Sequence, residues 1–270
     1  MMNEDKLIEI NKNLWNGKTP IHVKSDFYDV DGFKKGKTSL NFPEIEALGN
    51  VKDKSILHLQ CHFGLDTLSL ARQGAKATGI DLSDKAIETA KSLNSELGLD
   101  AEFICTNLYD LKNYLNKKFD IVFTSYGVTC WLPDLDKWAE IISYYLKEDG
   151  MFYMIEFHPI LCMYDENFEK LKYSYFNRGP IIEEQKGTYT DRGAEFKQRS
   201  CEWSHSISEV MGSLLKKGFK IVSFEEFPFS VYNCFNKMVK DEHGFWEIEG
   251  LEDIIPMMYS IKAVKDIMQL

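Results

Sequence analysis

Asp81 is the residue whose type and spacing point most directly to chemistry. It follows the apolar segment 76–80, which we predict to be a strand, and a strand, a tight loop and a helix precede it within residues 55–74. In open α/β sheets, ligands bind at the carboxyl ends of the strands, where a carboxylate can accept hydrogen bonds from both hydroxyls of a ribose. The pattern therefore predicts a site for a nucleoside-bearing cofactor. An ordinary turn in which Asp81 only caps a helix is the alternative.

The loop between the first strand and the helix must lie next to that cofactor. It resembles motif I of the class I S-adenosylmethionine-dependent methyltransferases, in which an acidic residue is followed by three glycines at alternate positions. Here His58 stands at the acidic position, Gln60 and His62 replace the first two glycines, and Gly64 is retained. A pyrophosphate needs the glycines because it approaches the backbone closely. S-adenosylmethionine has no phosphate, so these substitutions argue more strongly against NAD as the cofactor than against S-adenosylmethionine.

The resemblance implies which other side chains bind the cofactor, S-adenosyl-L-methionine. Asn107 and Leu108 follow the third strand, where the family usually has an acidic and an apolar residue around the adenine, and an Asn carbonyl can still accept from the adenine amino group. Ser125 and Tyr126 follow the fourth strand and should lie beside the donor methyl. The expected cofactor-binding residues are Trp15, Tyr28, Gln60, Cys61, His62, Gly64, Asp81, Leu82, Asn107, Leu108, Ser125 and Tyr126.

The acceptor is expected to be a small molecule. The Asn-Pro-Pro-Tyr type of motif that marks nucleobase methylation in this family is absent. The run HLQCHFGLDTLSLARQGA is similar to that of a bacterial subgroup of small-molecule methyltransferases. We predict that the substrate pocket lies beside Tyr126 and is formed by Trp131, Tyr189, Trp203 and His205.

Methyl transfer from a sulfonium is an in-line displacement, to which the protein contributes position and a dry pocket. A hydroxyl, thiol or protonated amine must also lose a proton, which needs a base within hydrogen-bond reach. Glu156 and His158, at the end of the fifth strand, are the nearest candidates, and His205 is a third. Each could make structural hydrogen bonds only, and an acceptor with a free amine needs no base.

We expect no metal site at His58 and His62, although they are spaced by four residues. His58 should lie in a strand and His62 in the following turn, so the helical spacing of zinc ligands is not available, and a third ligand is not evident. His58 should instead hydrogen-bond the loop or the amino acid group of the cofactor.

Strands and helices alternate along most of the chain, which predicts an α/β fold. The resemblance implies a Rossmann-like, mostly parallel seven-stranded sheet with helices on both faces and an antiparallel last strand. The predicted strands are 56–59, 76–80, 101–105, 119–124, 151–157, 219–229 and 257–264. The predicted helices are 65–72, one that starts after the N-cap Ser83 and stops at Gly98, 135–146, and one that starts near Ser206.

A long connection follows the fifth strand. Roughly 45 residues separate it from the next helix, and connections of that length are usually lids or binding loops. We predict that the aromatic segment 158–205 is an inserted substrate cap, in which 179–190 and 195–203 pair as a hairpin around residues 191–193. A dimerisation surface is the alternative, because aromatic residues are also enriched at interfaces.

The chain is expected to form one domain. Leu7, Ile10 and Leu14 share one face of a predicted N-terminal helix, and an aromatic-rich loop with Tyr28 and Phe33 follows it, so this arm could close over the cofactor or serve only as packed support. The expected parts are an N-terminal lid (1–50), a cofactor-binding core (51–157), the cap (158–205) and a C-terminal helix with a strand hairpin (206–270).

Composition limits the partners. The formal net charge is −10 and no Lys/Arg cluster is present, which argues against nucleic acid and anionic membranes and favours a neutral or cationic small substrate. The six cysteines contain no C-x-x-C pair, so we expect free thiols in a reducing, cytoplasmic compartment. The charged start of the chain does not resemble a signal peptide.

Two other function classes stay open. A nicotinamide-dependent oxidoreductase would share Asp81 but should have the fingerprint G-x-G-x-x-G, which this loop lacks. A protein that binds the cofactor without turnover, such as a sensor, could have the same cofactor site.

Overall fold

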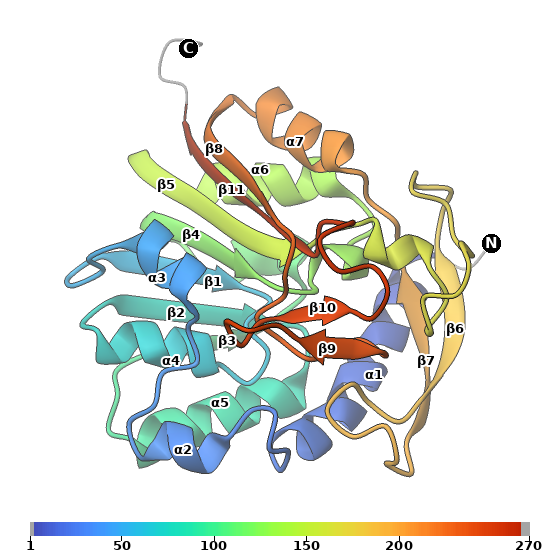
Figure 1. The fold of residues 1–270 in the computed structure, drawn as a ribbon. Coiled ribbons are helices and arrows are strands. Elements are labelled where there is room, and N and C mark those ends of the chain that lie inside the picture. The colour runs from blue at the N-terminus through green and yellow to red at the C-terminus, as the bar shows by residue number, and fades with distance from the viewer. Residues whose placement is uncertain (1–2, 266–270) are drawn as a thin grey trace.

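The structure, a computed structural model, describes residues 3–265 and is built around a seven-stranded sheet (Figure 1). Its strand order is β3-β2-β1-β4-β5-β11-β8. The strands are β1 (Ser55–Leu59), β2 (Lys76–Asp81), β3 (Glu102–Cys105), β4 (Phe119–Ser125), β5 (Leu146–Phe157), β8 (Phe219–Phe227) and β11 (Met258–Lys265). The order reverses between β1 and β4, so their carboxyl ends form the switch point at which ligands bind in such sheets.

The strand β11 is antiparallel to both of its neighbours, β5 and β8, whereas β1 to β5 pair in parallel. The predicted seven-stranded sheet with an antiparallel last strand is therefore confirmed.

Helices cover both faces of the sheet. On one face, α3 (Phe42–Leu48), α4 (Leu65–Arg72) and α5 (Asp84–Glu96) enclose buried residues such as Ile56 and Phe123. On the other face, η1 (Leu108–Asn113), α6 (Leu135–Tyr145) and α7 (Ile207–Lys216) pack with Leu57 and the fully buried Trp138. Full burial of one large apolar side chain contributes about 1.5 to 3 kcal/mol, so both faces hold the site edge rigidly.

The helix boundaries follow the expected caps. The Ser83 hydroxyl accepts a hydrogen bond from the N–H of Ala86 at 3.0 Å, and the Ser206 hydroxyl accepts one from the N–H of Glu209 at 3.2 Å. Just after the C-cap of α5, Gly98 has a φ of +62°, a conformation that glycine adopts without a Cβ penalty.

The N-terminal segment contains more helix than expected. The helix α1 (Glu4–His22) was predicted, but Phe33 lies in the short helix α2 (Val30–Lys34) and not in a loop, and α3 was not predicted. The Asp29 carboxylate caps α2 by accepting from the N–H of Gly32 at 3.0 Å. Because these helices are short, their stability comes from tertiary packing, which a single sequence does not reveal.

The helix α1 connects the core to the segment after β5 (Figure 1). The Asn11 amide donates to the carbonyl of Cys201 at 2.7 Å and accepts from its N–H at 2.9 Å. Five residues further along α1, the Asn16 amide donates to Asp84 at 2.7 Å and accepts from the Ser83 hydroxyl at 2.7 Å. The arm is thus fixed to both parts by side-chain hydrogen bonds.

The segment after β5 contains the predicted hairpin. The strands β6 (Ile181–Lys186) and β7 (Lys197–Glu202) pair antiparallel, which confirms this prediction, and the turn η3 (Leu161–Met163) precedes them. A second small hairpin, β9 (Met238–Lys240) with β10 (Trp246–Ile248), lies between β8 and β11. Across residues 3–265, each helix is too short or too polar to pass through a lipid bilayer.

Candidate functional site

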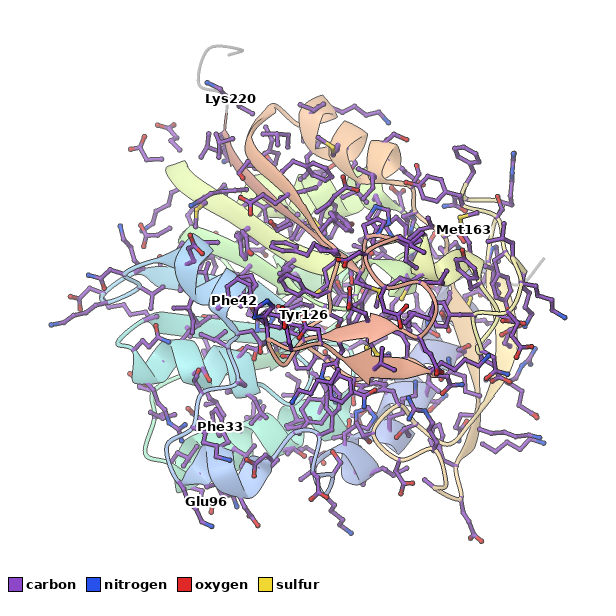
Figure 2. The ribbon with its side chains drawn as sticks, in the orientation of Figure 1. Phe33, Phe42, Glu96, Tyr126, Met163 and Lys220 are labelled. Atoms are coloured by element: carbon purple, nitrogen blue, oxygen red, sulfur yellow. The ribbon has the colours of Figure 1, made fainter. Side chains whose placement is uncertain are left out.

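A cavity of about 1530 Å³ lies where the carboxyl ends of β1, β2, β4 and β5 meet α1 and the β6–β7 hairpin. Figure 2 shows Tyr126 near the middle of the molecule, whereas Glu96 and Lys220 lie at its periphery. The cavity is lined by every predicted site residue except His158: Trp15, Tyr28, Gln60, Cys61, His62, Gly64, Asp81, Leu82, Asn107, Leu108, Ser125, Tyr126, Trp131, Glu156, Tyr189, Trp203 and His205. The structure therefore brings residues from most of the chain to one place.

The loop after β1 has the backbone of a glycine-rich turn although it contains one glycine. The φ angles of Gln60, His62 and Gly64 are +55°, +51° and +82°, so all three positions are left-handed. A Cβ on Gly64 would lie 2.6 Å from the Phe103 ring and 3.0 Å from the Cβ of Ala90, which explains why this glycine is retained. The two other positions bear about 1 to 2 kcal/mol of strain each.

Asp81 lies at the end of β2 and closes this loop. Its carboxylate accepts hydrogen bonds from the N–H of His62 at 2.8 Å and from the N–H of Ser83 at 2.8 Å. Burial raises its pKa to about 6, while the backbone N–H donors act in the opposite direction. Each oxygen keeps a free lone pair for a further donor, such as a ribose hydroxyl.

His58 and Asp66 form a buried polar network beside the loop. The His58 ring lies 2.9 Å from the Thr67 hydroxyl and 3.1 Å from the Ser125 hydroxyl, and burial lowers its pKa to about 3, so the ring is neutral. The Asp66 carboxylate accepts from Ser125 at 3.2 Å and from Ser39 at 2.6 Å. Burial raises the Asp66 pKa, and within residues 3–265 no cationic side chain lies within 4.0 Å of this carboxylate.

Histidines 58 and 62 do not converge. The Nε2 of His62 lies 3.0 Å from the Nδ1 of His22, and its own Nδ1 is buried without a hydrogen-bond partner among the described residues. Burial lowers the pKa of His62 to about 3 and that of His22 to about 2. Both rings are therefore neutral, in an edge-on cluster with Trp15.

Glu156 holds the turn that follows β4. Its carboxylate accepts from the backbone N–H groups of Gly127, Val128 (2.9 Å) and Thr129 (3.0 Å), and also from the Thr129 hydroxyl at 3.1 Å. The N–H of Phe157 adds a fifth hydrogen bond at 2.7 Å. Both carboxylate oxygens are therefore engaged in fixing the backbone around this turn. This geometry favours a structural role over the predicted role as base.

The structure does not bring His158 to the cavity. Its Nε2 lies 3.0 Å from the Glu226 carboxylate on β8, and its Nδ1 accepts from the N–H of Ile160 at 3.2 Å. Both ring nitrogens are engaged, and burial lowers the His158 pKa. The strand β5 ends at Phe157, so His158 lies just beyond the strand and not on it. This position gives the prediction of a catalytic His158 no support.

The N-terminal arm and the cap meet above the loop. The hydroxyls of Tyr28 and Tyr189 share a hydrogen bond, and the Tyr189 ring centre lies 4.7 Å from that of His22. The Trp15 ring meets the Trp131 ring edge-on at 5.4 Å between centres. Residues predicted separately for a lid and a substrate pocket therefore form one aromatic wall.

The cap is fixed to the core on its other side. The N–H of Trp203 donates to the carbonyl of Cys130 at 2.8 Å. The Nε2 of His205 donates to the carbonyl of Leu132 at 2.8 Å, and its Nδ1 lies 3.1 Å from the Glu209 carboxylate. The Nε2 contact fixes the ring to the core, whereas Nδ1 makes no hydrogen bond among the described residues.

The cavity lining also contains charged residues that the sequence did not single out, among them Lys18, Asp66 and Glu202. Lys18 is 4% exposed, and burial lowers its pKa to about 8, while burial raises the Glu202 pKa. Lys18 follows Asn11 and Trp15 on one face of α1, and this spacing of a lysine among inward-facing residues is the signal that could have identified it.

Comparison with known proteins agrees with this geometry. Residues 56–150 match a family model described as a methyltransferase domain. Over 104 residues, the chain is 30% identical to the ubiquinone biosynthesis O-methyltransferase of Pseudoalteromonas translucida strain TAC 125. That alignment covers 37% of this chain, and the chain spans less than half of the relative's length, 44%.

Solved structures resemble the chain over most of its length. A crystal structure of an S-adenosylmethionine-dependent methyltransferase from Clostridium acetobutylicum ATCC 824 has a TM-score of 0.57 at 17% identity and covers 95% of this chain and 98% of its own. The DhpI–SAH complex has a TM-score of 0.59 at 14% identity and covers 98% of this chain and 100% of its own. The chain therefore has the fold of the class I S-adenosylmethionine-dependent methyltransferases, and its residues 56–150 match a methyltransferase domain.

Proposed function

We propose that this protein binds S-adenosylmethionine and transfers its methyl group to a small-molecule acceptor, leaving S-adenosylhomocysteine. The main support is one observation: Asp81 and the left-handed loop at Gln60, His62 and Gly64 line the same cavity as the aromatic wall of the cap. A donor at the loop and an acceptor under the cap would share one cavity, as a direct transfer requires.

The residues of the cavity fit this cofactor. Asp81 would accept from the ribose hydroxyls, and Leu82, Asn107 and Leu108 would surround the adenine. Asp66 is a partly buried carboxylate without a cationic side chain within 4.0 Å among the described residues, so it would bind the α-ammonium of the cofactor. In this arrangement, Asp66 takes over the charge that the family usually places at the position of His58.

The protein would act mainly by positioning and by excluding water. The bound cofactor supplies the electrophilic methyl group and its own leaving group. Glu156 would hold the turn at Gly127 to Thr129, and so place Tyr126 beside the reacting centre. Trp15 from the arm and Tyr189 from the cap would cover the pocket, together with Trp131 from the turn after β4. We also place the chain in the bacterial small-molecule subgroup with the HLQCHFGLDT form of the loop.

Calorimetry with S-adenosylmethionine, S-adenosylhomocysteine and NAD tests the cofactor. We expect both adenosyl ligands to bind and Asp81→Ala to weaken them by about tenfold to a hundredfold, because two charge-assisted hydrogen bonds are lost. Asp110→Ala, at an exposed position outside the cavity, is the matched control and should change nothing. A preference for NAD, or unchanged affinity in folded Asp81→Ala, would refute the assignment.

Turnover separates an enzyme from a cofactor-binding sensor. We expect the protein to release S-adenosylhomocysteine when it is incubated with S-adenosylmethionine and bacterial metabolite extracts. Trp203→Phe should lower this release and leave S-adenosylmethionine affinity within a few fold, because the side chain would touch only the acceptor. Release that is absent with all extracts would favour the sensor.

A further inference from the structure

Lys18 is a buried cation that faces the cavity. It lies on α1 with Trp15 and is 4% exposed. Its ammonium nitrogen lies 5.0 Å from the ring centre of Trp15 and 5.8 Å from that of Trp131. Both distances are within the range of cation–π attraction, so the two indoles hold the ammonium at the cavity wall.

No protein anion neutralises this charge directly. Within residues 3–265, no carboxylate oxygen lies within 4.0 Å of the Lys18 nitrogen, and its side chain makes no hydrogen bond to protein. Glu202, on β7, acts on it only at longer range, and one Glu202 oxygen accepts from the Gln185 amide at 3.0 Å. A buried ammonium has three N–H donors, and leaving them unpaired is costly. Residues 3–265 therefore offer no hydrogen-bond acceptor to the Lys18 ammonium, and a bound ligand could supply one.

The position of Lys18 indicates which ligand this is. Its neighbours include Trp131, on the turn after β4, and Glu202, at the end of the cap hairpin, which lie on the side of the cavity assigned to the methyl acceptor. Trp15 and His62, which were assigned to the cofactor, also lie near it, so Lys18 stands where the acceptor would meet the cofactor. The expected α-ammonium site of the cofactor is at Asp66, which Ser39 and Ser125 hold by hydrogen bonds. The cavity thus offers the Asp66 carboxylate to the cofactor and the Lys18 ammonium to the methyl acceptor.

We propose that Lys18 binds a carboxylate of the methyl acceptor, so that the substrates are small organic acids with a flat apolar body that packs on Trp15 and Trp131. This inference rests on the proposed function and names its substrate class. An acidic substrate differs from the neutral or cationic one that the net charge of −10 favours. A cation inside the cavity lies much closer to the substrate than the charges of the outer surface, so its effect on the substrate is stronger.

The test uses the full chain saturated with S-adenosylhomocysteine. Benzoate, 4-hydroxybenzoate, phenylacetate and indole-3-acetate are titrated by calorimetry, each beside its uncharged carboxamide. We expect at least one acid to bind about tenfold or more tightly than its amide, as a charge-assisted hydrogen bond would give. Lys18→Met should abolish this preference, and Lys18→Arg should retain most of it. Lys12→Met, on the same helix but outside the cavity, is the matched control.

Three outcomes overturn the proposal: amides that bind as tightly as the acids, a preference for acids that persists in Lys18→Met, or a panel in which no acid binds. If Lys18→Met instead weakens S-adenosylmethionine by tenfold or more and leaves the acid preference intact, the anion belongs to the cofactor, which also overturns the proposal. Failure of the unaltered protein to bind S-adenosylhomocysteine would refute the proposed function itself.

Discussion

The hydroxyls of Tyr28 and Tyr189 form a hydrogen bond across 161 residues of sequence and join the N-terminal arm to the cap. The His22 ring packs on both, with its centre 5.5 Å from that of Tyr28 and 4.7 Å from that of Tyr189. The cover of the cavity is therefore one unit made from two distant segments, and neither segment can open without separating this pair.

The tyrosine pair predicts a coupling between arm and cap. Tyr28→Phe and Tyr189→Phe should each weaken S-adenosylhomocysteine binding, by about 0.5 to 1.5 kcal/mol, because each removes the shared hydrogen bond. The double variant should be no weaker than the more affected single variant. Calorimetry of the four proteins measures this coupling, and strictly additive losses would show that the two segments act independently.

Asp81 predicts how cofactor binding depends on pH. Its pKa in the free protein is raised to about 6, and hydrogen bonds from ribose hydroxyls to the carboxylate would lower it. Binding then releases a proton below pH 6, so S-adenosylhomocysteine affinity should fall as the pH falls from 7 to 5, by up to about tenfold per unit. In Asp81→Asn the affinity should be lower and nearly flat over this range.

The same shift affects the free protein. Because the folded pKa of Asp81 lies above its ordinary value of 3.8, the folded state binds more protons than the unfolded state between pH 3.8 and about 6. This group therefore makes the protein less stable as the pH rises through that window. Chemical denaturation of Asp81→Asn beside the unaltered protein isolates the contribution, and identical pH profiles would contradict it.

Substitutions at Glu156 and His158 should affect stability and turnover differently. Glu156→Gln places an amide NH₂ among backbone N–H donors, so the free energy of unfolding should fall by about 1 to 3 kcal/mol. The residual turnover should keep the pH profile of the unaltered enzyme, since no base is removed. His158→Asn should retain turnover within about twofold, because its side chain lies outside the cavity. A rate that loses its rise with pH in Glu156→Gln would restore Glu156 as the base.

Gly64 and Gly98 form a matched pair for the loop. Both have positive φ, but a Cβ on Gly98 would meet open space, whereas one on Gly64 would lie 2.6 Å from the Phe103 ring. Gly98→Ala should therefore cost about 1 kcal/mol of stability. Gly64→Ala should lower the stability further and should also weaken cofactor binding, since the loop must shift. Thermal and chemical denaturation measure both losses. If Gly64→Ala and Gly98→Ala lose the same stability, the positive φ alone explains the need for glycine at position 64.

The sequence predicts the sheet and the main helices well because these elements depend on local patterns. The helix α4, with bounds Leu65–Arg72, agrees with its prediction, since an apolar stripe and Gly74 define it. The cap hairpin was predicted from its turn residues 191–193. Strand order could be inferred only through the family resemblance.

The charged residues of the cavity were harder to predict. Lys18 and Glu202 become neighbours only because Asn11 fixes α1 to β7, which are far apart in sequence. His158 follows the fifth strand, but its contact with Glu226 arises from the packing of β8. The five hydrogen bonds of Glu156 depend on a turn near residue 128. Such roles arise from tertiary contacts, and the type of side chain alone is compatible with several different roles.

The position of β11 has a consequence for synthesis of the chain. The strands β1 to β5 can pair as soon as residue 157 has left the ribosome, but β8 contacts the sheet only through β11, which is made some thirty residues later. Until residues 258–265 emerge, the open side of β5 presents free backbone donors and acceptors that another nascent chain could pair with. Completion of the sheet is thus tied to the last stage of translation, and ribosome pausing within residues 230–257 would prolong exposure of that edge.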